Sequence, residues 1–217
     1  MRYDAIIFDK DGVLIDTEPY YAARRHAFFA EAGIDDSGFP DFYGSNNKVI
    51  WETAVPDDPV RRRELFDRFC ERFKDDPIPF ARLAVPGVRK VLAGCRARGC
   101  AVGLASSAPR WGIQAFLDAL DLGGFFDAVL SGEECPAPKP APDVYLEAMA
   151  HLGVPAEKTL VVEDSPLGIR AAHDAGATVC AVMPPSCPDL DQSLADVRIS
   201  RLRDLPALLD AGDHFCR

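Results

Sequence analysis

Short apolar runs and amphipathic stretches alternate along most of the chain. The first run, residues 3–8, carries Ala5, Ile6, Ile7 and Phe8 without a polar break, which is typical of a strand buried on both faces of a parallel sheet. Further strands are predicted at residues 100–105, 126–130, 159–162 and 178–182, and helices at residues 86–98, 111–120, 143–152, 167–175 and 205–210. This alternation predicts an α/β fold, in which parallel crossover units place helices on both faces of a sheet.

The stretch between the first strand and residue 86 is helical instead. A helix is predicted over residues 18–32, because Gly33 can end it, and a short one over residues 48–54. A third helix begins at the sequence Asp57-Asp58-Pro59 and continues to residue 73. The predicted organisation is a core domain of residues 1–15 and 83–217, with residues 16–82 inserted as a helical domain.

Charge and composition narrow the classes of partner. The 217 residues are 48% hydrophobic with a formal net charge of −10, so we expect a globular protein that binds neither nucleic acid nor an anionic membrane. No apolar run reaches the length of a membrane span and no signal-peptide pattern precedes the first strand, so a cytoplasmic location is expected. An anionic substrate would need a local positive device, such as a metal ion.

Seven cysteines are scattered along the chain without a Cys-x-x-Cys pair or a nearby histidine. They resemble neither a disulfide framework nor a zinc site, and we assign them no role. They are Cys70, Cys95, Cys100, Cys135, Cys180, Cys187 and Cys216.

Two carboxylates follow the first strand. Asp9 stands at its carboxyl end, the edge where open α/β sheets bind ligands, and Gly12 frees the backbone to bring Asp11 toward the same pocket. One carboxylate of such a pair can act as a nucleophile while the other gives and takes a proton. The alternative interpretation is an ordinary strand-to-turn junction, where Asp and Gly are common.

Polar residues at later strand ends favour the chemical interpretation. Ser106 and Ser107 follow the second strand, where a hydroxyl and free N–H groups at a helix start can bind phosphate. Lys139 lies in a proline-restricted loop, and Glu163 and Asp164 follow the fourth strand. Clustered with Asp9, these carboxylates could bind Mg²⁺, which prefers oxygen ligands.

Together these segments resemble the four motifs of the haloacid dehalogenase superfamily. The matching residues are Asp9-Lys10-Asp11-Gly12-Val13, Ser106, Lys139 and Glu163-Asp164. The sequences Asp16-Thr17-Glu18, Lys139-Pro140-Ala141-Pro142-Asp143 and Glu163-Asp164-Ser165 are similar to its β-phosphoglucomutase-like, phosphatase-rich branch. The resemblance covers most of the chain and implies a Rossmann-like core with strand order 3-2-1-4-5 and a helical cap inserted after the first strand.

The resemblance also implies residue roles. Asp9 would attack phosphorus and become an aspartyl phosphate, while Asp11 would protonate the leaving alkoxide and then activate water. Ser106 and Ser107 would bind the phosphoryl group, and Lys139 would neutralise charge. Mg²⁺ would be held by Asp9, by the backbone carbonyl of Asp11 and by Asp164. Glu163 would be a direct ligand of the metal or lie just beside its ligands. Dehalogenases of the superfamily lack the second Asp, so that activity is disfavoured.

Some positions depart from the mutases of this branch. Tyr21 stands where they carry a hinge histidine, and residues 43–48 lack the arginine that grips a second phosphate. Lys10 stands where a hydrophobic residue is common, and we expect its side chain to point away with little effect on chemistry. Candidate substrate contacts are Asn46, Asn47, Lys48 and Arg110.

The leading hypothesis is a Mg²⁺-dependent phosphatase acting on a small phosphate ester, such as a sugar phosphate or phosphoglycolate. A phosphomutase of the β-phosphoglucomutase type is the nearest alternative. A non-catalytic phosphoacceptor is a third, although receiver domains lack the second Asp and a large cap. The substrate is not fixed by these motifs, and the chain could be a monomer or a homodimer.

Overall fold

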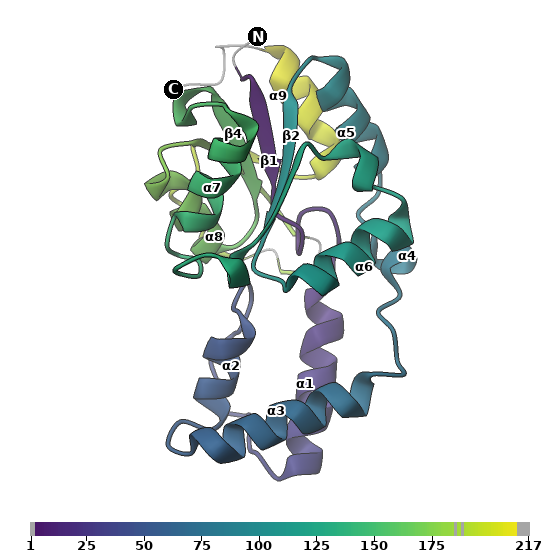
Figure 1. Ribbon diagram of the computed structural model, residues 1–217, viewed down its shortest axis with the longest axis vertical. Coiled ribbons are helices and arrows are strands. Elements are labelled where there is room, and N and C mark those ends of the chain that lie inside the picture. The colour runs from purple at the N-terminus through teal and green to yellow at the C-terminus, as the bar shows by residue number, and fades with distance from the viewer. Residues whose placement is uncertain (1–2, 185, 188, 212–217) are drawn as a thin grey trace. The chain divides into compact units, whose positions relative to one another are not determined.

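A computed structural model describes residues 3–184, 186–187 and 189–211. Its centre is a parallel sheet in the order β3-β2-β1-β4-β5-β6 (Figure 1). The strands are β1 (Ala5–Phe8), β2 (Ala101–Ser106), β3 (Ala128–Ser131), β4 (Thr159–Glu163), β5 (Thr178–Val182) and β6 (Val197–Ile199). The predicted α/β fold and the strand order 3-2-1-4-5 are confirmed. The sequence missed β6, a three-residue edge strand with no buried residue.

Alternate residues of each strand face two different helical layers. In β1, Ile6 and Phe8 pack into one hydrophobic cluster with helices α5, α6 and α9, whereas Ile7 packs into the other with α7 and α8 (Figure 1). The helices are α5 (Val88–Ala97), α6 (Arg110–Leu120), α7 (Asp143–Leu152), α8 (Pro166–Asp174) and α9 (Leu205–Ala211), joined by 3₁₀ turns at Gly123–Phe125, Gly132–Glu134, Ala156–Lys158 and Leu202–Asp204. Burial on both faces explains the unbroken apolar sequence of the strands.

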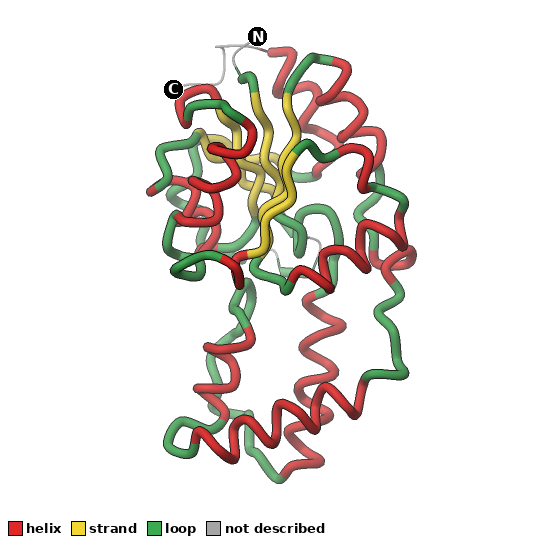
Figure 2. Tube along the Cα trace, in the orientation of Figure 1, coloured by secondary structure: helices red, strands yellow, loops and turns green. Residues whose placement is uncertain are grey.

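The chain divides into two compact units, residues 1–16 with 80–217, and residues 17–79. In Figure 2 the strands all belong to the first of these, the sheet unit. The chain leaves and rejoins the sheet unit at one point, because Asp16 N donates to Leu83 O over 2.9 Å and Val85 N donates to Leu14 O over 3.0 Å.

The sequence placed Asp16 in the insertion, but it belongs to the sheet unit. The same is true of residues 80–82. They form most of a short helix, α4 (Phe80–Leu83), that the sequence did not predict. The Phe80 ring meets the Phe116 ring of α6 edge-on at 6.0 Å, and this contact fixes α4 to the core.

The second unit contains α1 (Glu18–Ala32), α2 (Asn47–Ala54) and α3 (Pro59–Phe73) around an aromatic cluster. Trp51 is its centre, and its ring makes edge-on contacts with the rings of Phe28, Phe29, Phe66 and Phe69. The helices of this unit have local start and stop signals. The side-chain amide oxygen of Asn46 caps α2, and the carboxylate of Asp58 caps α3. Gly33 ends α1 in the left-handed conformation. We call residues 17–79 the helical unit.

Two further sequence expectations concern absences. No helix among the described residues is long and apolar enough to cross a membrane. Cys70, Cys95, Cys100, Cys135 and Cys180 are free thiols, of which Cys95, Cys100 and Cys180 are buried in the sheet unit, and Cys216 lies outside the described residues.

Candidate active site

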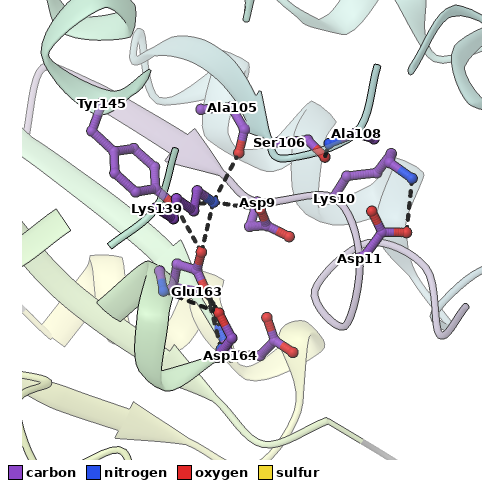
Figure 3. Close-up of polar contacts among 12 residues, drawn as sticks. Asp9, Lys10, Asp11, Ala105, Ser106, Ala108, Lys139, Tyr145, Glu163 and Asp164 are labelled. Carbon is purple, nitrogen blue, oxygen red and sulfur yellow. Dashed lines mark hydrogen bonds and ion pairs between the residues drawn. The ribbon is translucent and has the colours of Figure 1, made fainter. Parts of the chain in front are cut away.

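The carboxyl ends of the three central strands bring most of the predicted residues together. Phe8 of β1 pairs in register with Leu104 of β2 and Val162 of β4, so the residues that follow these strands reach one edge of the sheet. There Asp9, Ser106, Glu163, Asp164 and Lys139 lie together, all of them buried. Figure 3 shows these residues around the ends of the strands.

Lys139 is the centre of the hydrogen-bond network. Its Nζ lies 2.7 Å from Asp9 Oδ1, 2.8 Å from Glu163 Oε1 and 2.8 Å from the Tyr145 hydroxyl (Figure 3). It also lies 3.3 Å from the carbonyl oxygen of Ala105 at the end of β2. One lysine from the loop before α7 therefore connects β1, β2 and β4.

The charges of this network are unequal, because one ammonium lies between two carboxylates. Burial raises the pKa of Asp9 to about 7, against the opposing attraction of Lys139. Burial would also raise the pKa of Glu163, but the charge of Lys139 and the hydrogen bonds from Lys139, Tyr145 and Ser165 together outweigh burial, and the pKa is lowered. The pKa of Lys139 lies well above its usual value, because Asp9 and Glu163 outweigh the opposite effect of burial. A further positive charge at this edge would favour the ionised form of Asp9.

Tyr145 is a further member of the network and lies outside the predicted motifs. It is fully buried on α7, and its hydroxyl donates to Glu163 Oε1 over 2.8 Å. One feature of the sequence could have indicated its role. Tyr145 lies on the apolar face of the helix that follows the Lys139 loop, and a buried tyrosine hydroxyl needs a polar partner. Its partner, Glu163 at the end of β4, depends on the tertiary fold, which no local pattern predicts.

Glu163 is enclosed by hydrogen bonds. Its Oε1 accepts from Lys139 and Tyr145, and its Oε2 accepts from Asp164 N at 2.8 Å, Ser165 N at 3.0 Å and Ser165 Oγ at 3.1 Å. The side chain fits only because residue 168 is glycine, since a Cβ there would lie 1.6 Å from Glu163 Oε1. Glu163 thus joins the lysine network to the first turn of α8.

Asp11 has a different cationic partner from Asp9. Gly12 has a φ of 83°, a left-handed conformation that favours glycine, and the turn returns Leu14 N and Ile15 N to the carbonyl oxygen of Lys10. The Asp11 carboxylate lies 2.7 Å from Lys10 Nζ (Figure 3). The expectation that Lys10 points away is therefore wrong, because its side chain reaches back to the carboxylate of the next residue.

The predicted phosphate-binding residues lie at the start of the loop after β2. Ser106 is buried and its Oγ accepts a hydrogen bond from Ala108 N over 3.1 Å, while Ser107 is partly exposed. Arg110, at the start of α6, is engaged elsewhere. Its guanidinium pairs through two nitrogens with Glu134 and donates to the carbonyl oxygen of Val129 over 2.8 Å.

The other predicted substrate contacts belong to the helical unit. Asn46 accepts a hydrogen bond from Val49 N over 3.0 Å and so caps α2. Asn47 and Lys48 are the first residues of that helix and are exposed. The expected role of all three in substrate binding stays a prediction.

The donor set at the strand ends suits a hard cation. Among the described residues, no group of three or more His, Cys, Asp or Glu side chains is arranged to hold a metal ion. Asp9 and Asp164, however, are buried carboxylates that follow the neighbouring strands β1 and β4. Two carboxylates fit Mg²⁺, which keeps several waters and usually takes one or two carboxylates together with a substrate phosphate.

Comparison with known proteins agrees with this geometry. The family model described as haloacid dehalogenase-like hydrolase matches residues 6–182. Hexitol phosphatase B of Escherichia coli strain K12 is 35% identical over 210 residues, which cover 94% of each chain. Phosphoglycolate phosphatase of Aquifex aeolicus is 27% identical over 94% of this chain and 96% of its own.

A solved structure shares the fold. CbbY from Rhodobacter sphaeroides, in complex with phosphate, matches with a TM-score of 0.77 and 24% identity over 94% of this chain and 96% of its own. At this identity the likeness concerns the fold alone.

Proposed function

The chain belongs to the haloacid dehalogenase-like hydrolase family, and we propose that it is a Mg²⁺-dependent phosphatase of small phosphorylated metabolites. The proposed substrates are sugar or sugar-alcohol phosphates and phosphoglycolate, the classes named for its relatives. The single observation that carries the proposal is the buried Asp9 carboxylate held 2.7 Å from Lys139, with a second aspartate two residues further along the chain.

In the proposed reaction Asp9 is the nucleophile. A carboxylate oxygen of Asp9 forms a bond to phosphorus as the ester P–O bond breaks, and Asp11 gives its proton to the departing alkoxide. Water then attacks the aspartyl phosphate while Asp11 takes the proton from it, which releases inorganic phosphate and restores Asp9. Lys139 offsets the repulsion between the carboxylate and the phosphate in both steps.

Bound Mg²⁺ would offset the negative charge of the carboxylates and of the phosphate oxygens. We propose that Asp9, Asp164 and the backbone carbonyl of Asp11 hold it. Glu163 was predicted as a ligand in or beside the first shell. Its five hydrogen bonds support the outer position, from which it orients Lys139 and the first turn of α8.

Phosphate release tests this function. The purified protein and its Asp9→Asn variant are each incubated with hexitol phosphates, hexose phosphates and phosphoglycolate. Each incubation is done once in the presence of Mg²⁺ and once in the presence of a chelator. We expect release to require Mg²⁺ and to fall by at least about 10³-fold in Asp9→Asn, because the nucleophile is lost. Asp118→Asn is a matched control, since Asp118 is an exposed residue of α6.

Other outcomes would identify the alternatives. Release that persists unchanged in Asp9→Asn would exclude the proposed mechanism. Isomerisation of a sugar 1-phosphate that requires a bisphosphate, with little net release, would indicate a phosphomutase. A long-lived aspartyl phosphate without turnover would indicate a phosphoacceptor.

A further inference from the structure

Lys10 is an unusual residue for the position it occupies. Its side chain is only 1% exposed, although lysine is almost never fully buried unless it is paired. It stands between the two aspartates at the end of β1. A buried ammonium at this position needs a polar or charged partner, and the identity of that partner indicates the role of Lys10.

That partner is the carboxylate of Asp11. Lys10 Nζ lies 2.7 Å from Asp11 Oδ1, and the Asp11 side chain is 32% exposed. On another side the ammonium lies 5.8 Å from the ring centroid of Phe116, a buried residue of α6. The cation is therefore fixed by the core, whereas the carboxylate is the more exposed member of the pair.

The backbone also holds Lys10 in place. Its carbonyl oxygen accepts hydrogen bonds from Leu14 N at 2.9 Å and Ile15 N at 3.1 Å. The stem of the side chain thus begins at a fixed turn and ends against a fixed ring. Such a side chain can serve as a rigid reference point for its neighbour.

We propose that Lys10 is a positioning residue for Asp11, and this proposal rests on the proposed phosphatase function. The two aspartates have separate cations, Lys139 for Asp9 and Lys10 for Asp11 (Figure 3). The ion pair with Lys10 holds the Asp11 carboxylate in one orientation, and in the proposed reaction Asp11 serves the leaving oxygen from this orientation. Lys10 itself touches no reacting atom in this scheme.

The test compares leaving groups. An alkoxide from a sugar or sugar-alcohol phosphate needs the proton of Asp11, whereas p-nitrophenolate leaves without one. We expect Lys10→Met to lower the ratio of kcat/KM for the alkyl phosphate to kcat/KM for p-nitrophenyl phosphate by about 10-fold, a part of the 10²–10⁴-fold that general acid catalysis supplies. In an Asp11→Asn background the same substitution should leave this ratio unchanged, since Lys10 acts through Asp11.

The variants suit a buried site. Methionine has a similar length and no charge, so it removes the buried ammonium, and the Asp11 carboxylate that loses its partner is 32% exposed and keeps contact with water. Lys10→Leu is the second variant, to be used if Lys10→Met does not fold. Lys74→Met is the matched control, because Lys74 forms an ion pair with Glu71 on the exposed face of the helical unit.

A stability measurement tests the pair without any assay of activity. Asp11→Asn leaves the Lys10 ammonium buried beside a neutral amide, so we expect a lower unfolding midpoint, and Lys10→Met added to it should restore part of the loss. Midpoints that change additively across the two single variants and the double variant would show that the two residues are not coupled.

Each failure has its own signature. Equal losses of kcat/KM for alkyl and aryl phosphates in Lys10→Met would overturn the positioning role while leaving the phosphatase intact. Absence of phosphate release by the unsubstituted protein would overturn both the function and the role that depends on it. A coupled midpoint together with a reduced alkyl-to-aryl ratio is the result that the proposal requires.

Discussion

At the scale of single residues, the carboxyl edge of the sheet has unequal numbers of opposite charges: the one ammonium of Lys139 lies between the carboxylates of Asp9 and Glu163. Lys139 contacts both Asp9 and Glu163, and the five hydrogen bonds to Glu163 favour its ionised form. Burial raises the pKa of Asp9 to about 7, because the attraction of Lys139 offsets burial only in part and the charge of Glu163 adds to the rise. A cation bound beside Asp9 would lower this pKa.

This raised pKa predicts how stability depends on pH. The folded protein binds the Asp9 proton more tightly than the unfolded chain does, whose pKa is 3.8, so the contribution of Asp9 to stability falls as pH rises from about 4 to 7. Asn cannot ionise. In a chelator, the melting temperature of Asp9→Asn minus that of the native protein should therefore increase between pH 5 and pH 8. The same measurement on Asp118→Asn should give no such increase, and a flat difference for both variants would contradict the prediction.

The positions of the candidate site residues were predictable where they depend on the strand pattern. Asp9, Ser106, Glu163 and Asp164 could be found because parallel strands end at one edge. The direction of Lys10 and the partner of Tyr145 could not, since both depend on side chains that the fold brings from elsewhere, Phe116 of α6 and Glu163 of β4.

At the scale of elements, α8 carries the Glu163 network. Ser165 caps the helix by accepting from Gly168 N over 3.1 Å, and Gly168 leaves room for the Glu163 carboxylate. Helix start and carboxylate orientation are therefore determined together.

Gly168→Ala should displace Glu163. The new Cβ would lie 1.6 Å from Oε1 and 2.0 Å from the carboxyl carbon, so we expect a loss of about 3 kcal/mol in the free energy of unfolding, measured by urea denaturation. Phosphate release should fall as well, because Lys139 loses an oriented partner. Gly112→Ala is the matched control, since Gly112 is likewise the third residue of its helix and its Cβ would meet only Pro109, at 3.6 Å. That variant should be neutral or up to about 1 kcal/mol more stable, and equal effects of the two substitutions would refute the steric argument.

Elements with strong sequence signals were predictable to within a few residues. The helix at Glu18–Ala32 ends at its glycine, and the strands at Thr159–Glu163 and Thr178–Val182 follow their apolar runs. The missed elements have weak signals: α4 has four residues, and β6 is an edge strand stabilised by its pairing with β5 rather than by burial.

At the scale of the whole molecule, the two units have separate hydrophobic clusters. The sheet unit has two layers of core, and the helical unit has a single aromatic cluster centred on Trp51. The smaller unit buries less surface for each residue, and is expected to be the less stable.

The two units should therefore unfold at different urea concentrations. In Trp111→Phe the remaining tryptophan is Trp51, which is 3% exposed and reports on the helical unit, whereas Cys180 is buried in β5 and reports on the sheet unit. We expect the red shift of Trp51 emission to precede the labelling of Cys180 by a thiol reagent, with the labelled site identified by mass spectrometry. Coincident transitions would show that the units unfold as one cooperative body.

The point at which the helical unit is inserted determines whether this unit can be replaced without disturbing the sheet. Ile15 and Ala84 lie opposite each other in an antiparallel bridge, so the sheet unit is closed behind the insertion. Because the two segments of the sheet unit that flank the insertion already pair with each other, the inserted segment can be exchanged without a change in the register of β1. Replacement of residues 17–79 would thus leave the buried carboxylates at the strand ends, Asp9, Glu163 and Asp164, in place.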